Sequence, residues 1–250
     1  MMRSGNPALN DATFSQYLGS HGSSEPMTIQ GTVNKTGLLL LICLISGSFL
    51  WNRFFESGQN PASIMGWMWG GVILGLITAL VVSFKPTTAP IGAPLYALFE
   101  GAALGGISAI YEAQFQGIVM QAVLLTFGTL FALLLAYKSR LIQATENFKL
   151  GVTAATGGIF FLYLISIVLG FFGINVSFLH SASPLSIGIS VFIVIIAALN
   201  LVLDFDFIET ATERGAPKYM EWRAAFGLMV TLVWLYLEIL RLLAKLNSRR

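Results

Sequence analysis

The sequence predicts an all-α membrane protein whose chain crosses the bilayer seven times. Three observations lead to this fold class: 56% of the 250 residues are hydrophobic, only 10% are charged, and long apolar runs recur along the chain. A soluble domain carries about 25% charged residues, so a deficit of this size indicates a surface that faces lipid. A spanning helix needs about 20 mainly apolar residues, and seven runs approach or reach that length.

Prolines set several ends of these runs. Pro86 ends the second run, because proline does not continue a helix and disfavours the helical conformation at the residue before it. Pro90 lies near the start of the third run, where proline is tolerated, and Pro184 marks the start of the sixth. The first run is short unless it extends to Phe55. The predicted spans cover residues 36–51, 64–84, 89–111, 117–137, 152–174, 185–207 and 222–243.

The polar N-terminal segment is predicted to be a mobile cytoplasmic tail, residues 1–33, ahead of a transmembrane domain over 34–246 and a basic tail over 247–250. It lacks the basic start and apolar centre of a secretory signal. The basic loops that follow the fourth and sixth runs belong on the inside, which puts the N-terminus in the cytoplasm and the protein in the inner, cytoplasmic membrane. The basic C-terminal residues would then lie outside, so the alternative is a last segment that re-enters and returns.

Composition also excludes several classes of function. The net charge is only +2 and the basic residues lie in loops and at the C-terminus, which argues against a nucleic-acid surface. Cys43 is the single cysteine, so no intrachain disulfide forms, and with His21 and His180 it makes a zinc site improbable. No resident cofactor is predicted.

Glycine pairs four residues apart predict where helices pack closely. Gly66 and Gly70 have this spacing in the second run, and Gly101 and Gly105 have it in the third. Small residues at this spacing let two helix backbones approach each other in a membrane. We interpret these glycines as packing positions rather than as parts of a ligand site.

Asp204 is one acid whose position a solvated loop does not account for, because it lies inside an apolar run. Ionisable groups inside a span are costly and usually face the bundle interior, a partner or a water path. Asn200 lies one turn before Asp204 on the same helix face, so it is predicted to bind that carboxyl group. Asp206 lies about 200° further round the helix, which places it at the interface or in water. Glu100, in the third run, has no assigned role.

Glu238 is the second such acid, in the middle of the seventh run. It forms either an intrahelical pair with Arg241, one turn on, or the second wall of a site with Asp204. Two carboxylates in a low-dielectric site cannot both ionise cheaply, so they share a proton or bind a cation. Calcium is a candidate cation, since it prefers several oxygen ligands. Lys85, at the end of the second run, either marks the membrane boundary or pairs with Asp204.

Four stretches of the chain are similar to one protein family. They are Gly31–Gly37, Leu95–Gly101, Leu203–Glu209 and Trp234–Leu240. With them the chain resembles the YccA-like bacterial branch of the Bax inhibitor-1 family over nearly its whole length. The resemblance implies seven helices in a bundle with the last helix near the centre, and a pH-sensitive calcium leak. It also implies two acids on the sixth and seventh helices that share a proton and close the pore, with a basic residue of the second helix latched onto the sixth-helix acid.

These implied roles fall on specific residues of this chain. Asp204 matches the sixth-helix aspartate, and Glu238 stands where the family has an aspartate on the seventh. The predicted sensor and calcium-binding pair is therefore Asp204 and Glu238. Lys85 is the nearest basic residue to the family's latch arginine, although lysine cannot pair bidentately. Asn200, Asp206 and Arg241 complete the candidate latch and supporting residues.

Two rival functions stay open. The first is a modulator that binds a membrane protease or another protein partner through residues 1–30. The second is an intramembrane aspartyl protease. The absence of a Gly-x-Gly-Asp motif argues against this function. The chain has neither a Gly-x-Ser-x-Gly motif nor a Gly-rich phosphate loop, so we predict that it is not an enzyme. Its expected partners are the lipid bilayer and calcium ions, and its oligomeric state is left open.

Overall fold

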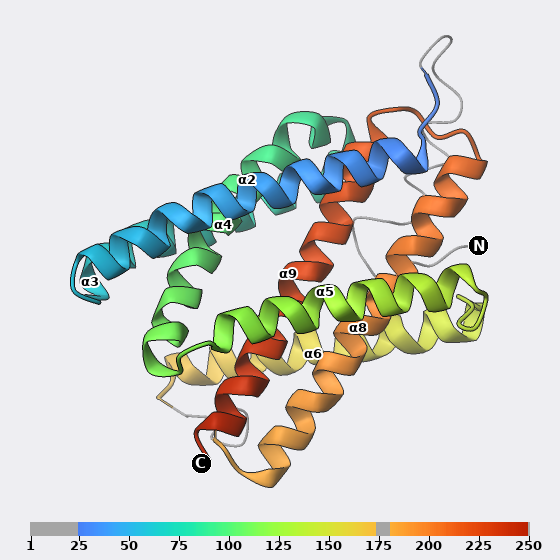
Figure 1. Ribbon diagram of the computed structural model, residues 1–250. Helices are drawn as coiled ribbons and strands as arrows, with labels where there is room; N and C mark the ends of the chain where they lie inside the picture. The colour runs from blue at the N-terminus through green and yellow to red at the C-terminus, as the bar shows by residue number, and fades with distance from the viewer. Residues whose placement is uncertain (1–24, 174–180, 250) are drawn as a thin grey trace. The chain divides into compact units, whose positions relative to one another are not determined.

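The computed structural model describes residues 25–173 and 181–249, and the long elements in these two ranges are helices (Figure 1). Within the described residues seven helices are long and apolar enough to cross a membrane, which confirms the predicted fold class. They are α2 (Ile29–Glu56), α3 (Ala62–Phe84), α4 (Ala89–Gln114), α5 (Ile118–Lys138), α6 (Glu146–Phe171), α8 (Pro184–Glu213) and α9 (Met220–Asn247), and a short 3-10 helix, η1 (Pro86–Thr88), precedes α4.

The described chain forms two compact units. The α5–α6 unit contains residues 120–173, 181–206 and 231–249, and the α2–α4 unit contains residues 25–119 and 207–230. Because α8 runs through residue 206 and α9 runs through residue 230, each of these helices contributes residues to both units.

The start of α2 lies earlier than hydropathy predicts. Thr28 caps the helix, since its side chain accepts a hydrogen bond from the Gly31 amide. The helix therefore begins at Ile29 rather than at residue 36, and its residues 29–33 belong to the segment predicted to be a mobile tail. Residues 1–24 of that predicted tail lie outside the described residues.

In the α2–α4 unit, α4 packs against α2 through glycine. A Cβ atom added to Gly105 would overlap the backbone of Gly47, and one added to Gly101 would overlap the backbone of Cys43. The backbones of α2 and α4 therefore approach each other at these two positions, which is the role that the glycine spacing predicts.

The packing glycines of α3 differ from the predicted ones. A Cβ atom added to Gly71 would lie 2.6 Å from the Phe99 carbonyl oxygen, and one added to Gly75 would lie 3.1 Å from Glu100. At Gly66 and Gly70, a Cβ atom would meet nothing within 4 Å. The spacing rule was wrong for this helix because it does not say which helix face meets α4.

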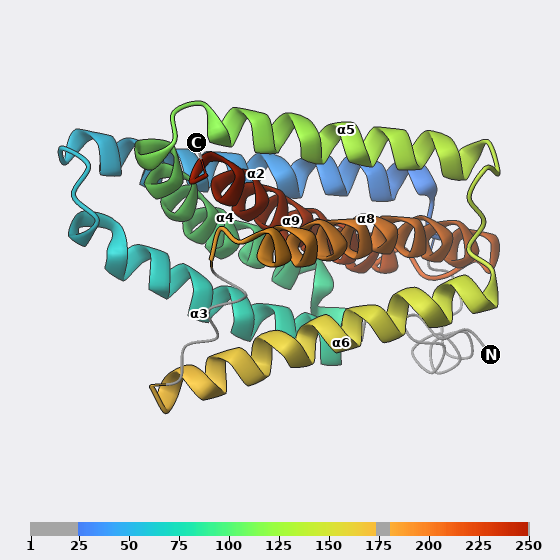
Figure 2. The ribbon, with the colours of Figure 1, turned by 90° about the horizontal axis from the view of Figure 1, so that it is seen from below.

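In the α5–α6 unit, α8 and α9 lie between α5 and α6 (Figure 2). The rings of Tyr137 on α5 and Phe205 on α8 are 5.9 Å apart. On the other side, Ile159 of α6 forms a buried cluster with Ile193 and Ile196 of α8, and Trp234 of α9 packs against it. Apolar contacts thus hold α8 on both sides, and they hold α9 on the side of α6.

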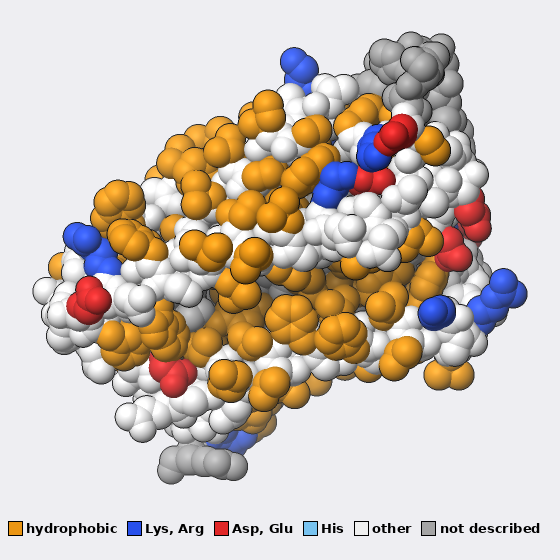
Figure 3. All heavy atoms as spheres, turned by 45° about the horizontal axis from the view of Figure 1, so that its top comes forward, with side chains coloured by type: hydrophobic (Ala, Val, Ile, Leu, Met, Phe, Trp, Pro, Cys, Tyr) orange, Lys and Arg blue, Asp and Glu red, His pale blue; other side chains and the backbone are white. Residues whose placement is uncertain are grey.

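The last helix is the most buried of the seven spans. Of the most apolar stretch of α9, 61% of residues are buried, against 22% or less in α2, α3, α5 and α6. On the face drawn in Figure 3, hydrophobic side chains cover broad stretches of the helices. An exposed apolar surface of this extent marks an interaction site for lipid or protein, and the length of the helices fits a bilayer. The chain is a multi-pass membrane protein.

Candidate functional site

A stripe of three polar residues runs along α6 in the α5–α6 unit. Lys149, Thr156 and Tyr163 are spaced seven residues apart, which is close to two helical turns, so they share one face of the helix. Each of them bonds to a polar residue of α8 or α9. We call these three residues, their partners on α8 and α9, and the neighbouring Asp204 of α8 the polar seam.

The first level of the seam is an ion pair. The Lys149 ammonium lies 2.7 Å from the Asp206 carboxylate and 3.8 Å from that of Glu146. Lys149 is buried, whereas the Asp206 side chain is 23% exposed. Asp206 therefore has a cationic partner on α6. Hydropathy gave no sign of this pair, because a lysine beside a loop is normally interpreted as a marker of the membrane boundary.

The second level joins an amide to a hydroxyl. The Asn200 side-chain nitrogen donates to the Thr156 hydroxyl and to the Ile196 carbonyl, each at 2.8 Å. This amide nitrogen has two N–H groups, so both of its donors are engaged in hydrogen bonds. The predicted Asn200 bond to Asp204 is not among these two bonds.

Asp204 lies one turn further along α8 and is only 3% exposed. The Thr231 side chain of α9 hydrogen-bonds its carboxyl group. Its second oxygen, Oδ2, is buried and has no hydrogen-bond partner among the described residues. An unsatisfied oxygen on a buried carboxyl group is costly, so this atom is where the seam can accept a proton or a cation.

The third level surrounds Glu238. Arg241 Nη1 lies 3.1 Å from both carboxylate oxygens of Glu238, and the Tyr163 hydroxyl donates to one of them at 2.9 Å. Arg241 also donates to Tyr163 at 2.6 Å, and the Trp234 indole reaches Glu238 at 3.3 Å. The predicted intrahelical pair of Glu238 and Arg241 is therefore present, and a tyrosine from α6 binds both members.

Two contacts give the same register between α8 and α9. Asp204 meets Thr231, and Ser190 accepts a hydrogen bond from Lys245 at 2.7 Å. Fourteen residues separate the two positions on each helix. Glu238 lies seven residues beyond Thr231, which is about 10 Å along the helix axis at 1.5 Å per residue. The two predicted gate carboxyls thus belong to different levels of the seam, and Asn200 occupies the level between them.

The three acids of the seam differ in their partners. Asp206 has Lys149 and Glu238 has Arg241, while Asp204 has no ion pair within the described residues. Lys85, the predicted latch, is exposed at the end of α3 in the other unit. Its pairing with Asp204 stays a prediction.

A calcium cage would need several converging oxygen ligands. Over residues 25–173 and 181–249, no group of three or more His, Cys, Asp or Glu side chains comes together to hold a metal. Calcium binding by Asp204 and Glu238 stays a prediction. The bound ion would be a transported ion and not a resident one.

Sequence reasoning missed Lys149, Thr156 and Tyr163. Their seven-residue spacing was visible in the sequence, but a polar residue every second turn in an apolar run carries little signal by itself. Their role becomes evident only when the partners on α8 and α9 are known, 44 residues away for Thr156 and 75 for Tyr163.

The chain was compared with known proteins. A family model described as Bax inhibitor 1 like matches residues 6–248. The search of curated proteins and the search of solved structures each returned no match. Since the family model covers nearly the whole chain, the protein belongs to the Bax inhibitor 1 like family.

Proposed function

We propose that this protein is a pH-sensitive leak channel for calcium in the cytoplasmic membrane, with its gate at Asp204 and Glu238. The observation that carries the proposal is the Asp204 carboxyl group, which is buried in a spanning helix with one oxygen unpartnered among the described residues. Burial of an ionisable group in a membrane costs free energy, and such a group usually belongs to an ion or proton path. The polar seam supplies further oxygen atoms along the same helices.

Protonation of Asp204 is the proposed switch. A neutral carboxyl group fits between α8 and α9 without a counter-ion, which favours the closed state. When the proton leaves, a charge with no cationic partner in the seam favours entry of a cation or separation of the two helices. Calcium flux therefore increases as pH rises.

Glu238 is the proposed second control point. Arg241 and Tyr163 occupy its carboxylate, so a cation that moves along the seam has to displace Arg241 from it. Direct sharing of one proton between the two acids requires contact of the carboxyl groups. The register of α8 and α9 puts about 10 Å of helix between them, so direct sharing belongs to another conformation of this pair.

Calcium flux into proteoliposomes tests the proposal. The wild-type protein is expected to conduct more calcium as pH rises, and Asp204→Asn is expected to conduct little at every pH, since the amide mimics the neutral acid. Asp206→Asn is the matched control, because Asp206 lies two residues away and pairs with Lys149. An unchanged pH response in both Asp204→Asn and Glu238→Gln would refute the proposed gate.

A further inference from the structure

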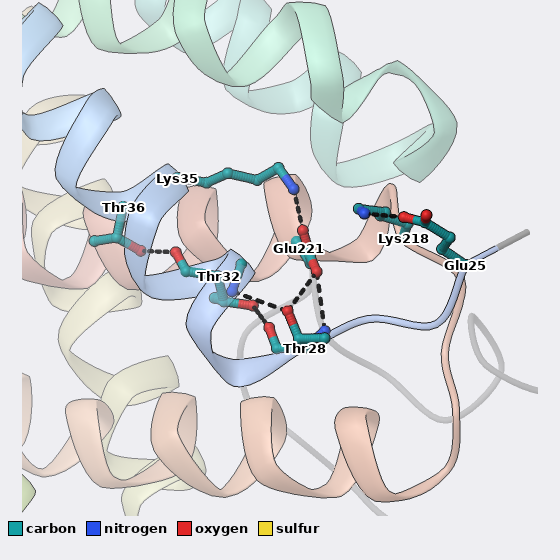
Figure 4. A network of polar contacts seen from close by, with 8 residues as sticks. Glu25, Thr28, Thr32, Lys35, Thr36, Lys218 and Glu221 are labelled. Carbon is teal, nitrogen blue, oxygen red and sulfur yellow. Dashed lines mark hydrogen bonds and ion pairs between the residues drawn. The ribbon is translucent and has the colours of Figure 1, made fainter.

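Residues Glu25–Thr28, which we call the strap, lie along the loop that joins α8 to α9. Figure 4 shows the polar part of this contact, in which Glu25 pairs with Lys218. The Met27 amide donates to the Ala216 carbonyl at 2.7 Å, and the Met27 side chain is 1% exposed. Pro26 forms an antiparallel bridge with Pro217. The strap and the loop thus pair over consecutive residues, within the α2–α4 unit.

Glu221 closes the strap from the first turn of α9. Its buried carboxylate accepts hydrogen bonds from the Thr28 amide and the Thr28 hydroxyl, each at 2.9 Å, and pairs with Lys35 (Figure 4). Lys35 also lies 5.4 Å from the centre of the Trp222 ring. Because Thr28 is the cap of α2, the carboxylate lies at the positive end of a 28-residue helix. One acid therefore joins the strap, α2 and α9.

Gly31 makes room for this acid. A Cβ atom added at Gly31 would overlap the Glu221 carboxylate, so any larger residue has to displace it. At Gly37, on the same helix, a Cβ atom would meet nothing within 4 Å. The two glycines differ in this one respect, which makes them a matched pair for an experiment.

We propose that the strap, closed by Glu221, holds the α8–α9 loop in place, and that Glu221 is a positioning residue for the two gate helices. The loop is the covalent link between the helix that carries Asp204 and the helix that carries Glu238. While the strap is closed, the joined ends of α8 and α9 are held against the start of α2. When the strap opens, the joined ends of α8 and α9 are free to move away from the start of α2. The effect on conduction rests on the proposed function, whereas closure of the strap does not.

A single methyl group tests the closure. In Gly31→Ala the Glu221 carboxylate is displaced, so the amides of Met27 and Thr28 lose their protection and exchange hydrogen about tenfold faster or more. Alanine favours a helix over glycine, so the variant does not unfold α2. In Gly37→Ala the same amides keep their wild-type exchange rates. If Gly31→Ala exchanges like the wild type, or if both variants exchange faster alike, the proposal is overturned.

An engineered disulfide tests the effect on conduction. Pro26→Cys with Pro217→Cys is made in a Cys43→Ala chain, which has no other cysteine. Bridged antiparallel residues have Cα atoms about 4.5 to 5.5 Å apart, a separation that a disulfide can span. The oxidised protein is expected to lose its increase in calcium flux at high pH, and a reductant is expected to restore it.

Controls separate the possible failures. Each single-cysteine chain has to respond to pH equally with and without reductant. If the oxidised double variant conducts as well as the reduced one, the strap does not control the gate. If the wild type conducts no calcium at any pH, the proposed function fails, while the exchange rates of Gly31→Ala still decide whether Glu221 closes the strap.

Discussion

Arg241 binds both oxygens of the Glu238 carboxylate, at 3.1 Å from Nη1 to each. The two residues are one turn apart on α9, where an exposed pair would contribute little to stability. This pair differs because the Glu238 side chain is 3% exposed while that of Arg241 is 35% exposed. The carboxylate therefore depends on Arg241, and Tyr163 from α6 holds the two together.

Removal of the arginine should leave a buried carboxylate without its cation. Breaking a buried pair costs about 3–5 kcal/mol, and the partial exposure of Arg241 reduces this figure, so we expect Arg241→Gln to lower the free energy of unfolding by about 2 kcal/mol. Denaturant unfolding of the protein in detergent micelles measures it. The double variant Arg241→Gln with Glu238→Gln should recover most of the loss. No recovery would show that Arg241 stabilises the protein by packing alone.

Glycine substitutions should separate close helix contacts from open positions. Gly105→Ala places a methyl group on the Gly47 backbone, where no flexible side chain can yield. Overpacking of this kind costs about 1–3 kcal/mol, measured as a lower unfolding midpoint. Gly66→Ala meets nothing within 4 Å, so the higher helix propensity of alanine should raise the midpoint slightly. Equal effects of the two variants would contradict the described contact of α2 with α4.

The sequence was sufficient for the seven spans, because length and hydropathy decide whether a helix can cross a bilayer. It was not sufficient for the start of α2. Gln30 belongs to the segment predicted to be a polar tail, and Lys35 precedes the first predicted span, yet both are helical. The cause is partly remote: Glu221 binds Thr28 and Lys35 from 193 and 186 residues away. Local patterns cannot encode a contact at that separation.

The candidate site shows the same division. Asp204 and Glu238 stood out in the sequence because acids are rare inside apolar runs. Their partners did not stand out, because Tyr163 and Thr231 are ordinary residues in membrane helices. The level of each acid along the helix pair also escaped prediction, since it depends on the register between α8 and α9. Helix periodicity fixes the face of a residue but not its neighbour across the interface.

The exposed pair of Glu25 and Lys218 should titrate as a unit. The hydrogen bond and charge of Lys218 hold the pKa of Glu25 below its usual 4.5, and Glu25 raises the pKa of Lys218 above its usual 10.5. Glu25 stabilises the folded protein at a pH above its usual pKa, and this stabilisation is lost as pH falls through the lowered pKa. Lys218 stabilises it at a pH below its usual pKa, and this stabilisation is lost as pH rises through the raised pKa. The contact therefore persists across neutral pH.

Carbon-13 NMR of labelled glutamate side chains measures this pair directly. In Lys218→Gln, the midpoint of the Glu25 titration should return towards its ordinary value. Because both side chains are in water, added salt should also reduce the difference between wild type and variant. Identical Glu25 midpoints in the two proteins at low salt would show that the strap does not keep this contact in solution.

Arg223 should prove to be the anchor of α3. This arginine of α9 is fully buried, and its guanidinium donates to the carbonyls of Val82 and Ser83, the latter at 3.1 Å. These carbonyls belong to the last turn of α3, which ends at Phe84, and a helix leaves its final carbonyls without partners. A cation there also meets the negative end of the helix dipole. Arg223 is therefore well placed to stabilise the end of α3.

Two substitutions at this position should differ in cost. Arg223→Lys keeps the charge but cannot reach both carbonyls in a fork, so we expect a loss of about 1 kcal/mol in the free energy of unfolding. Arg223→Met leaves the buried Val82 carbonyl and the partly buried Ser83 carbonyl without this donor and should cost about 3 kcal/mol. Hydrogen exchange in the last turn of α3 should accelerate in the same order. Lys85→Gln is the control: its side chain is exposed beside the same helix end, so it should leave both measurements unchanged. A cost for Lys85→Gln equal to that of Arg223→Met would contradict the assignment of Arg223 as the anchor of this helix end, because an exposed lysine would then stabilise it as much as the buried arginine.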